Sequence, residues 1–157
     1  MDELNRLADA VERTVNGPVW HGTALGELLS DVSVDHALAN PIPGAHSIWE
    51  LVHHISAWAR IAEARLADEP PPEPTDADDW PPVTRPTPSG WKRALEQLTE
   101  SHSSLAHAVR RCDPATLNRR MPGRKHSART MLLGIPEHGA YHGGQIVLLT
   151  RALQNRP

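Results

Sequence analysis

The sequence has few aromatic residues, a single cysteine and no long apolar run. Its 157 residues include no phenylalanine, one tyrosine and one cysteine. A single cysteine excludes an internal disulfide and favours a reducing compartment. No segment approaches the run of about 18 apolar residues that a membrane span needs, so no membrane partner is expected. The acidic start at residues 1–3 lacks the basic region of a secretory signal, so we expect a cytoplasmic protein.

Signals for β-strands and for nucleic-acid binding are lacking too. The sequence has no alternating β-branched runs and no Asn-Gly hairpins, which are the usual marks of strands. Its net charge of −3 argues against a general affinity for nucleic acid. Histidine and proline are abundant instead, with ten and fifteen residues. Histidine is the commonest metal ligand in proteins, so its placement needs explaining.

Apolar periodicity predicts four long helices within a single domain, 1–157. The first covers residues 2–15, the second 47–66, the third 89–111, and the fourth ends near residue 153. Ser47 and Glu50 have the spacing of a capping box at the start of the second helix. Pro136 predicts a kink or a restart in the fourth helix, one turn before His138. We therefore predict an all-α fold, an up-down four-helix bundle.

Residues 68–90 interrupt this pattern with eight prolines. Proline at this density is incompatible with a helix or a central strand. The segment therefore reads as a long exposed crossover between the second and third helices, pinned by Trp80. Seven basic residues gather in 110–129. They are most simply a solvated loop, and their functional reading is an anion-attracting rim at one end of the bundle.

His138 and His142 lie four residues apart in the fourth helix. At about 100° per residue their side chains are only about 40° apart, on the stripe that Leu149 continues into the core. Buried imidazoles need partners, and one divalent metal ion would satisfy both. Hydrogen bonding to carboxylates or to the backbone is the alternative for such a pair.

The second helix offers two adjacent histidines, His53 and His54. His53 lies about 165° from the centre of the buried stripe, whereas His54 lies about 95° away, at the edge of the stripe. His54 also shares a row with Trp58. We therefore assign His54 as the third ligand beside His138 and His142, with a solvated rim position as its alternative.

Three imidazoles from facing helices suit Zn²⁺, Ni²⁺, Fe²⁺ or Cu²⁺ and are poor ligands for Ca²⁺ or Mg²⁺. Three protein ligands leave a position for water or substrate, which is the catalytic pattern for zinc. Glu137 precedes the first histidine, so the His-Glu-x-x-His order of metalloproteases is not met. His102 lies in the apolar seam of the third helix, either as a hydrogen-bonded core residue or as a fourth ligand. Tyr141, Gln145, Trp58 and His102 are predicted to lie around the metal or its pocket.

Two segments resemble the DinB/YfiT-like superfamily. They are residues 47–55, which contain His53-His54-Ile55, and residues 137–146, which contain Tyr141-His142-Gly143-Gly144-Gln145. The resemblance implies a four-helix bundle in which His54, His138 and His142 bind one divalent ion, often nickel or zinc, with iron as a further possibility. It also implies a homodimer. Characterised relatives include bacillithiol and mycothiol S-transferases and a thiol-dependent maleylpyruvate isomerase.

Three functional classes remain open at the level of the sequence. The first is a metal-dependent transferase that adds a low-molecular-weight thiol to a small electrophile. The second is a hydrolase or isomerase that uses metal-bound water, and the third is a non-enzymatic metal-binding protein linked to stress. An open coordination position that faces a pocket favours an enzyme, whereas a fourth protein ligand favours a structural metal.

Overall fold

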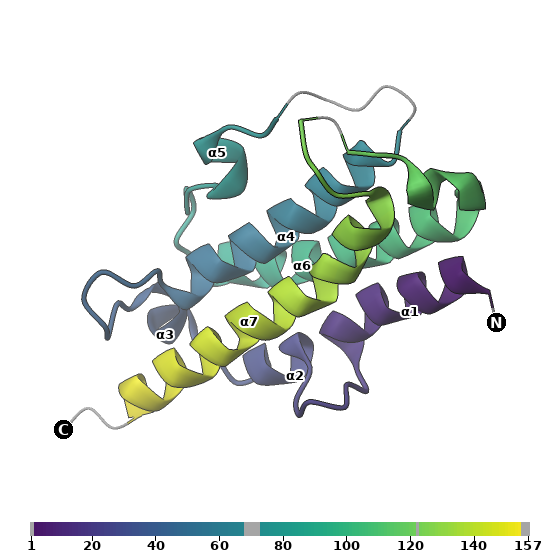
Figure 1. Cartoon of the computed structure of the whole chain (residues 1–157). Helices are drawn as coiled ribbons and strands as arrows, with labels where there is room; N and C mark the ends of the chain where they lie inside the picture. The colour runs from purple at the N-terminus through teal and green to yellow at the C-terminus, as the bar shows by residue number, and fades with distance from the viewer. Residues whose placement is uncertain (1, 68–72, 122, 155–157) are drawn as a thin grey trace.

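The computed structural model describes residues 2–67, 73–121 and 123–154, and it is built from helices (Figure 1). The elements are α1 (Glu3–Asn16), α2 (Leu25–Leu29), α3 (Val34–Leu38), α4 (Ile48–Arg65), α5 (Asp76–Asp79), α6 (Pro88–Arg111), the 3-10 helix η1 (Pro114–Asn118) and α7 (Ala128–Gln154). No strand forms in these ranges, which contain only two isolated β-bridges. The predicted all-α class is confirmed. None of the helices in the described part of the chain is long and apolar enough to cross a membrane.

Local sequence signals predict the start of α4 correctly but do not predict the course of α7 at Pro136. The Ser47 side chain accepts a hydrogen bond from the Glu50 backbone, and the Glu50 carboxylate accepts one from the Ser47 backbone. This is the predicted capping box. Of the kink or restart predicted at Pro136, the restart is wrong, because α7 continues through this proline as one helix. Proline removes one backbone hydrogen bond, while Leu132 and Ile135 are buried in the core immediately before it and hold the helix in place.

The four long helices do not alternate strictly in direction. Trp49 and Trp91, near the starts of α4 and α6, have ring centroids 5.2 Å apart. Ser104, in the second half of α6, donates to Glu63 near the end of α4 at 2.8 Å. These contacts make α4 and α6 parallel, and α1 and α7 run the opposite way (Figure 1). The predicted up-down order is therefore wrong between the second and third long helices. The chain that joins them returns to the starting end of α4 before α6 begins.

The described part of that connection is more ordered than its composition predicts. Residues 68–72 of the predicted crossover lie outside the described residues. Beyond them, Thr75 and Asp78 form a second capping box that starts the short helix α5. The prediction of an irregular segment is therefore wrong at residues 76–79. The turn places Asp79 and Trp80 directly against α4.

The basic segment 110–129 is held in place by hydrogen bonds and ion pairs. The Arg119 guanidinium donates to the backbone oxygens of Arg65 and Leu66, each at 2.9 Å, and so satisfies carbonyls that the end of α4 leaves unpaired. Arg129 binds the carboxylate of Glu3 at 2.6 Å. Several charges of the segment 110–129 therefore connect helices. The prediction that this segment is simply a solvated loop is wrong.

Two apolar clusters fill the core, and a polar layer separates them. One cluster contains Leu66, Leu105 and Leu132, and the other contains Ile55, Leu98 and Ile146. On α7 the two clusters are separated by the segment that carries His138 and His142, and on α6 by the turn that carries His102. The histidines therefore lie halfway along the helices, with apolar core on both sides.

Two glycines of α7 are expected to respond in opposite ways to alanine. A Cβ at Gly139 would overlap the methyl group of Thr14, and the Thr14 side chain is short and buried. A Cβ at Gly144 would meet no atom within 4 Å. Overpacking costs about 1–3 kcal/mol, and removing an exposed helical glycine gains about 1 kcal/mol. Gly139→Ala should lower, and Gly144→Ala should raise, the free energy of unfolding in urea. Equal shifts in the same direction would contradict the close approach of α1 and α7 at Gly139.

Candidate metal centre

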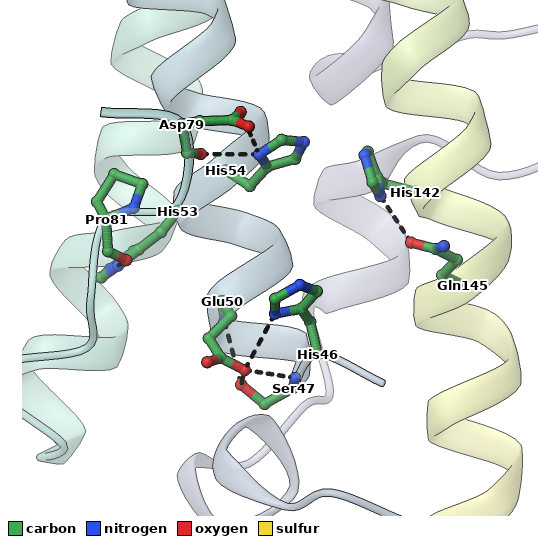
Figure 2. Close-up of polar contacts among 9 residues, drawn as sticks. All are labelled: His46, Ser47, Glu50, His53, His54, Asp79, Pro81, His142 and Gln145. Atoms are coloured by element: carbon green, nitrogen blue, oxygen red, sulfur yellow. Dashed lines mark hydrogen bonds and ion pairs between the residues drawn. The ribbon is translucent and has the colours of Figure 1, made fainter. Parts of the chain in front are cut away.

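The structure brings together the ring nitrogens of His54, His138 and His142. His138 Nε2 lies 2.9 Å from His54 Nε2 and 3.0 Å from His142 Nε2. One ligand atom from each of the three residues lies within 4.8 Å of the others. His54 and His142 are 5% and 6% exposed. Figure 2 shows His54 on α4 and His142 on α7 on the facing sides of the two helices.

Outer hydrogen bonds orient two of these rings. His54 Nδ1 lies 2.8 Å from the Asp79 carbonyl oxygen and 3.1 Å from its carboxylate, and His142 Nδ1 lies 2.6 Å from Gln145 Oε1 (Figure 2). Oxygen acceptors require the proton to be on Nδ1 in both neutral rings. The Nε2 atoms of His54 and His142 therefore carry lone pairs, which is the form that binds a metal.

The three Nε2 atoms cannot satisfy one another with hydrogen bonds alone. If His138 carries a proton on Nε2, that proton can be donated to only one of its two neighbours. At least one lone pair of His54 or His142 then remains without a donor from this cluster, although the two residues are almost fully buried. A cation among the three nitrogens would satisfy all of them, so the donor set fits a divalent metal ion.

Burial keeps these imidazoles neutral. Burial, together with the proximity of His142 and His54, lowers the pKa of His138 to about 3. Burial also lowers the pKa of His54 and of His142, against the opposing hydrogen bonds of Asp79 and Gln145. Protonated imidazole cannot coordinate a metal. At neutral pH all three nitrogens are consequently in the form that a metal requires.

The crossover supplies residues that the sequence did not predict for this site. Trp80 stacks on His54, with ring centroids 3.9 Å apart, and its other face stacks on His46 at 3.6 Å. Asp79 accepts from Trp58 Nε1 at 2.6 Å as well as from His54. Trp80 was expected only to pin the crossover. The one signal in the sequence for a role at this site was that Trp80 is the sole aromatic residue of a proline-rich segment.

His53 lies outside the cluster because both of its nitrogens have other partners. The indole of Trp49 donates to His53 Nε2 at 2.9 Å, and His53 Nδ1 lies 3.2 Å from the carbonyl oxygen of Pro81. His53 thereby joins the start of α4 to the crossover, while its neighbour His54 turns toward α7. The choice of His54 over His53 by helical phase agrees with this geometry.

The remaining predicted residues lie at different distances from the cluster. Tyr141 touches His142 edge-on at 4.9 Å between ring centroids but is largely exposed. The His138 ring lies 6.0 Å from that of Trp58. His102 is 1% exposed, donates from Nδ1 to the Leu98 carbonyl at 2.9 Å, and has no partner at Nε2. It does not belong to the cluster that could hold a metal in the described part of the chain.

A pocket of about 300 Å³ opens beside His138. Its apolar wall includes Trp58, Met131 and Ile135. We call it the His138 pocket. No fourth histidine, cysteine or carboxylate joins the three histidines among the described residues. A metal held there would keep a coordination position for a small molecule, as catalytic sites do and closed structural sites do not.

Comparison with known proteins identifies the family. The sequence model of the DinB superfamily matches residues 19–146. The chain belongs to the DinB superfamily. No curated protein and no solved structure matches the chain significantly. The match spans α2 to α7 up to Ile146 and includes all three clustered histidines.

In this DinB-superfamily chain, Gln145 is expected to tune the metal without binding it. Gln145→Ala removes the acceptor that fixes the His142 tautomer, and the loss of such an outer partner weakens metal binding about 10–100-fold. Competition with a chelator of known affinity would measure the change. Gln154→Ala is the matched control, because Gln154 is exposed near the end of the same helix. Equal affinities in the two variants would contradict this role of Gln145.

Proposed function

We propose that the chain is a metal-dependent thiol S-transferase, in which His54, His138 and His142 bind one Zn²⁺ or Ni²⁺ ion, with Fe²⁺ as a weaker candidate. The observation that carries the proposal is the cluster of three neutral imidazole nitrogens beside the His138 pocket, with no fourth ligand among the described residues. When bound, the ion would act as a Lewis acid that lowers the pKa of a coordinated thiol toward neutrality. The partners are a low-molecular-weight thiol and a small electrophile.

The surrounding residues orient the ligands and exclude water. Asp79 and Gln145 keep a proton on Nδ1 of His54 and His142, so that both Nε2 atoms stay available. Trp80 covers one face of the His54 ring. Trp58 and Met131 offer apolar surface in the His138 pocket, where an organic substrate can lie.

The environment of the pocket favours thiol transfer over the other two classes. A hydrolase that activates water needs a general base within hydrogen-bond reach of that water. None of the described residues that line the pocket carries a carboxylate, and the one free imidazole of its lining, His126, lies before the start of α7, about three helical turns from His138. A purely structural metal would be expected to have four protein ligands, and the cluster offers three in the described ranges.

Conjugation of a thiol to a fluorogenic electrophile tests the proposal. Zinc- or nickel-loaded protein is mixed with a chlorobimane-type electrophile and with bacillithiol, mycothiol or glutathione in turn. We expect a rate above background with one of the thiols, lost in His138→Ala and retained in His53→Ala. Both variants remove one imidazole, but His53 is bound to Trp49 and Pro81 instead of the cluster. No conjugation with any thiol or metal would refute thiol transfer.

The proposal includes the setting of the site. The centre lies in a single four-helix-bundle domain, in which the proline-rich crossover brings Trp80 against the His54 ring. A cytoplasmic location suits a thiol cosubstrate, because thiols stay reduced there. A homodimer is proposed as well, and the exposed side chains of Tyr141 and Leu148 offer apolar surface for it. Sedimentation at two protein concentrations would distinguish a dimer from a monomer.

A further inference from the structure

The His138 pocket has a cationic end away from the histidine cluster. Arg65 and Arg124 line it together with His126. Arg65 is only 3% exposed, and a buried guanidinium requires an anionic partner. No described residue that lines the pocket is acidic. The electrostatic field inside the pocket therefore favours a negatively charged ligand.

One carboxylate is shared by the two arginines. Glu73 Oε2 accepts from Arg65 at 2.9 Å and from Arg124 at 2.7 Å. The hydrogen bond from Arg124, with the charge of both guanidinium groups, lowers the pKa of the Glu73 carboxyl. Two positive groups share one negative group, so a net positive charge remains. The Glu73 side chain is 45% exposed, and its carboxylate is therefore open to exchange with an anion from solution.

We infer that the His138 pocket binds an organic carboxylate whose charged end takes the place of Glu73 between Arg65 and Arg124. The inference rests on the proposed function in one respect, namely that the other end of this ligand is the thiol at the metal. It narrows the substrate class to thiols that carry a carboxylate. Arginine pairs recognise carboxylates through paired, charge-assisted hydrogen bonds, which neutral amides and alcohols cannot match.

The geometry of α7 sets the reach of this ligand. Thr130, at the cationic end, and His138, at the metal end, both line the pocket. The two residues are eight positions apart in the helix, which corresponds to about 12 Å along the axis. The long side chains of the arginines shorten the span that the ligand must bridge. A thiol and a carboxylate joined by several methylene groups fit this distance, with the chain lying on Trp58, Met131 and Ile135.

The test uses Co²⁺-loaded protein and three probes of one chain length. These are 6-mercaptohexanoate, 6-mercaptohexanamide and hexanoate. The Co²⁺ absorption spectrum reports thiol coordination, and calorimetry reports binding of all three. We expect the mercapto acid to bind at least about tenfold more tightly than the mercapto amide, which is the usual strength of a hydrogen-bonded charge.

Variants separate the subsite from general charge attraction. Arg124→Gln should abolish the preference for the acid. Lys125→Gln, which removes the same charge from an exposed neighbour that does not line the pocket, should retain it. Glu73→Gln should raise the affinity for the acid and leave that for the amide unchanged. A purely structural ion pair predicts lower stability without any gain in affinity.

The outcomes of the two proposals are distinguishable. Equal affinities for mercapto acid and amide in the wild-type protein, or a preference that survives Arg124→Gln, would overturn the carboxylate subsite and leave thiol transfer standing. If neither thiol changes the Co²⁺ spectrum, thiol transfer fails. The subsite is then judged on hexanoate, which must bind the wild-type protein and lose its affinity in Arg124→Gln for the inference to stand.

Discussion

Replacing His138 by alanine is expected to abolish binding of the divalent ion. His138 Nε2 lies within 3.0 Å of both other nitrogens of the cluster, so its loss leaves only the separated pair of His54 and His142. One ligand of a protein zinc site contributes several kcal/mol, so affinity should fall about a hundredfold or more. Metal analysis of protein purified with equimolar Zn²⁺ should change from about one ion per chain to almost none.

His53→Ala is the matched control for this result. His53 and His54 are adjacent in α4, but only His54 belongs to the cluster. The His53 variant should keep its metal, and a His54→Ala variant should lose it. Circular dichroism of each variant excludes simple unfolding as the cause. A His53 variant that loses metal while His54→Ala retains it would reverse the assignment.

Replacing Trp49 by alanine is expected to give the largest loss of stability. Trp49 is 1% exposed, its ring contacts Trp91, and its indole nitrogen donates to His53. Removing a buried tryptophan costs about 3–5 kcal/mol through lost burial and the cavity that remains. The loss also leaves His53 Nε2 without its donor. Urea unfolding at neutral pH should show this decrease in the free energy of unfolding.

Trp20→Ala provides the contrast, because Trp20 is 98% exposed. Substitutions at exposed positions usually change stability by less than about 0.5 kcal/mol. The two variants remove the same side chain from the same protein. The difference between their free energies of unfolding therefore measures the contribution of burying the Trp49 side chain. A decrease below about 1 kcal/mol for Trp49→Ala would contradict the tight packing at the start of α4 and α6.

Helical periodicity was sufficient to predict the histidine cluster but not its surroundings. His54, His138 and His142 lie on regular helices, where residue spacing fixes direction. Asp79 and Trp80 come from a segment between helices, whose path depends on tertiary contacts such as the bond from Trp58 to Asp79. No periodicity relates such a segment to the helix that it covers. The same limitation explains the missed pairing of Glu73 with Arg65 and Arg124.

The errors about helix direction and Pro136 have a related cause. The composition of residues 68–90 shows that they connect two helices but not to which end they return. The parallel order of α4 and α6 is set by contacts such as Trp49 with Trp91. At Pro136, local propensity predicts a break, whereas core packing on both sides maintains one helix. Tertiary contacts decide both features.

Anomalous diffraction from crystals of the zinc-loaded protein tests the metal centre most directly. The structure predicts one peak at the zinc edge, about 2.0–2.1 Å from each Nε2 atom of His54, His138 and His142. The Nδ1 atoms of His54 and His142 should remain bound to Asp79 and Gln145. A peak elsewhere in the molecule, or zinc bound through Nδ1 of these residues, would contradict the account.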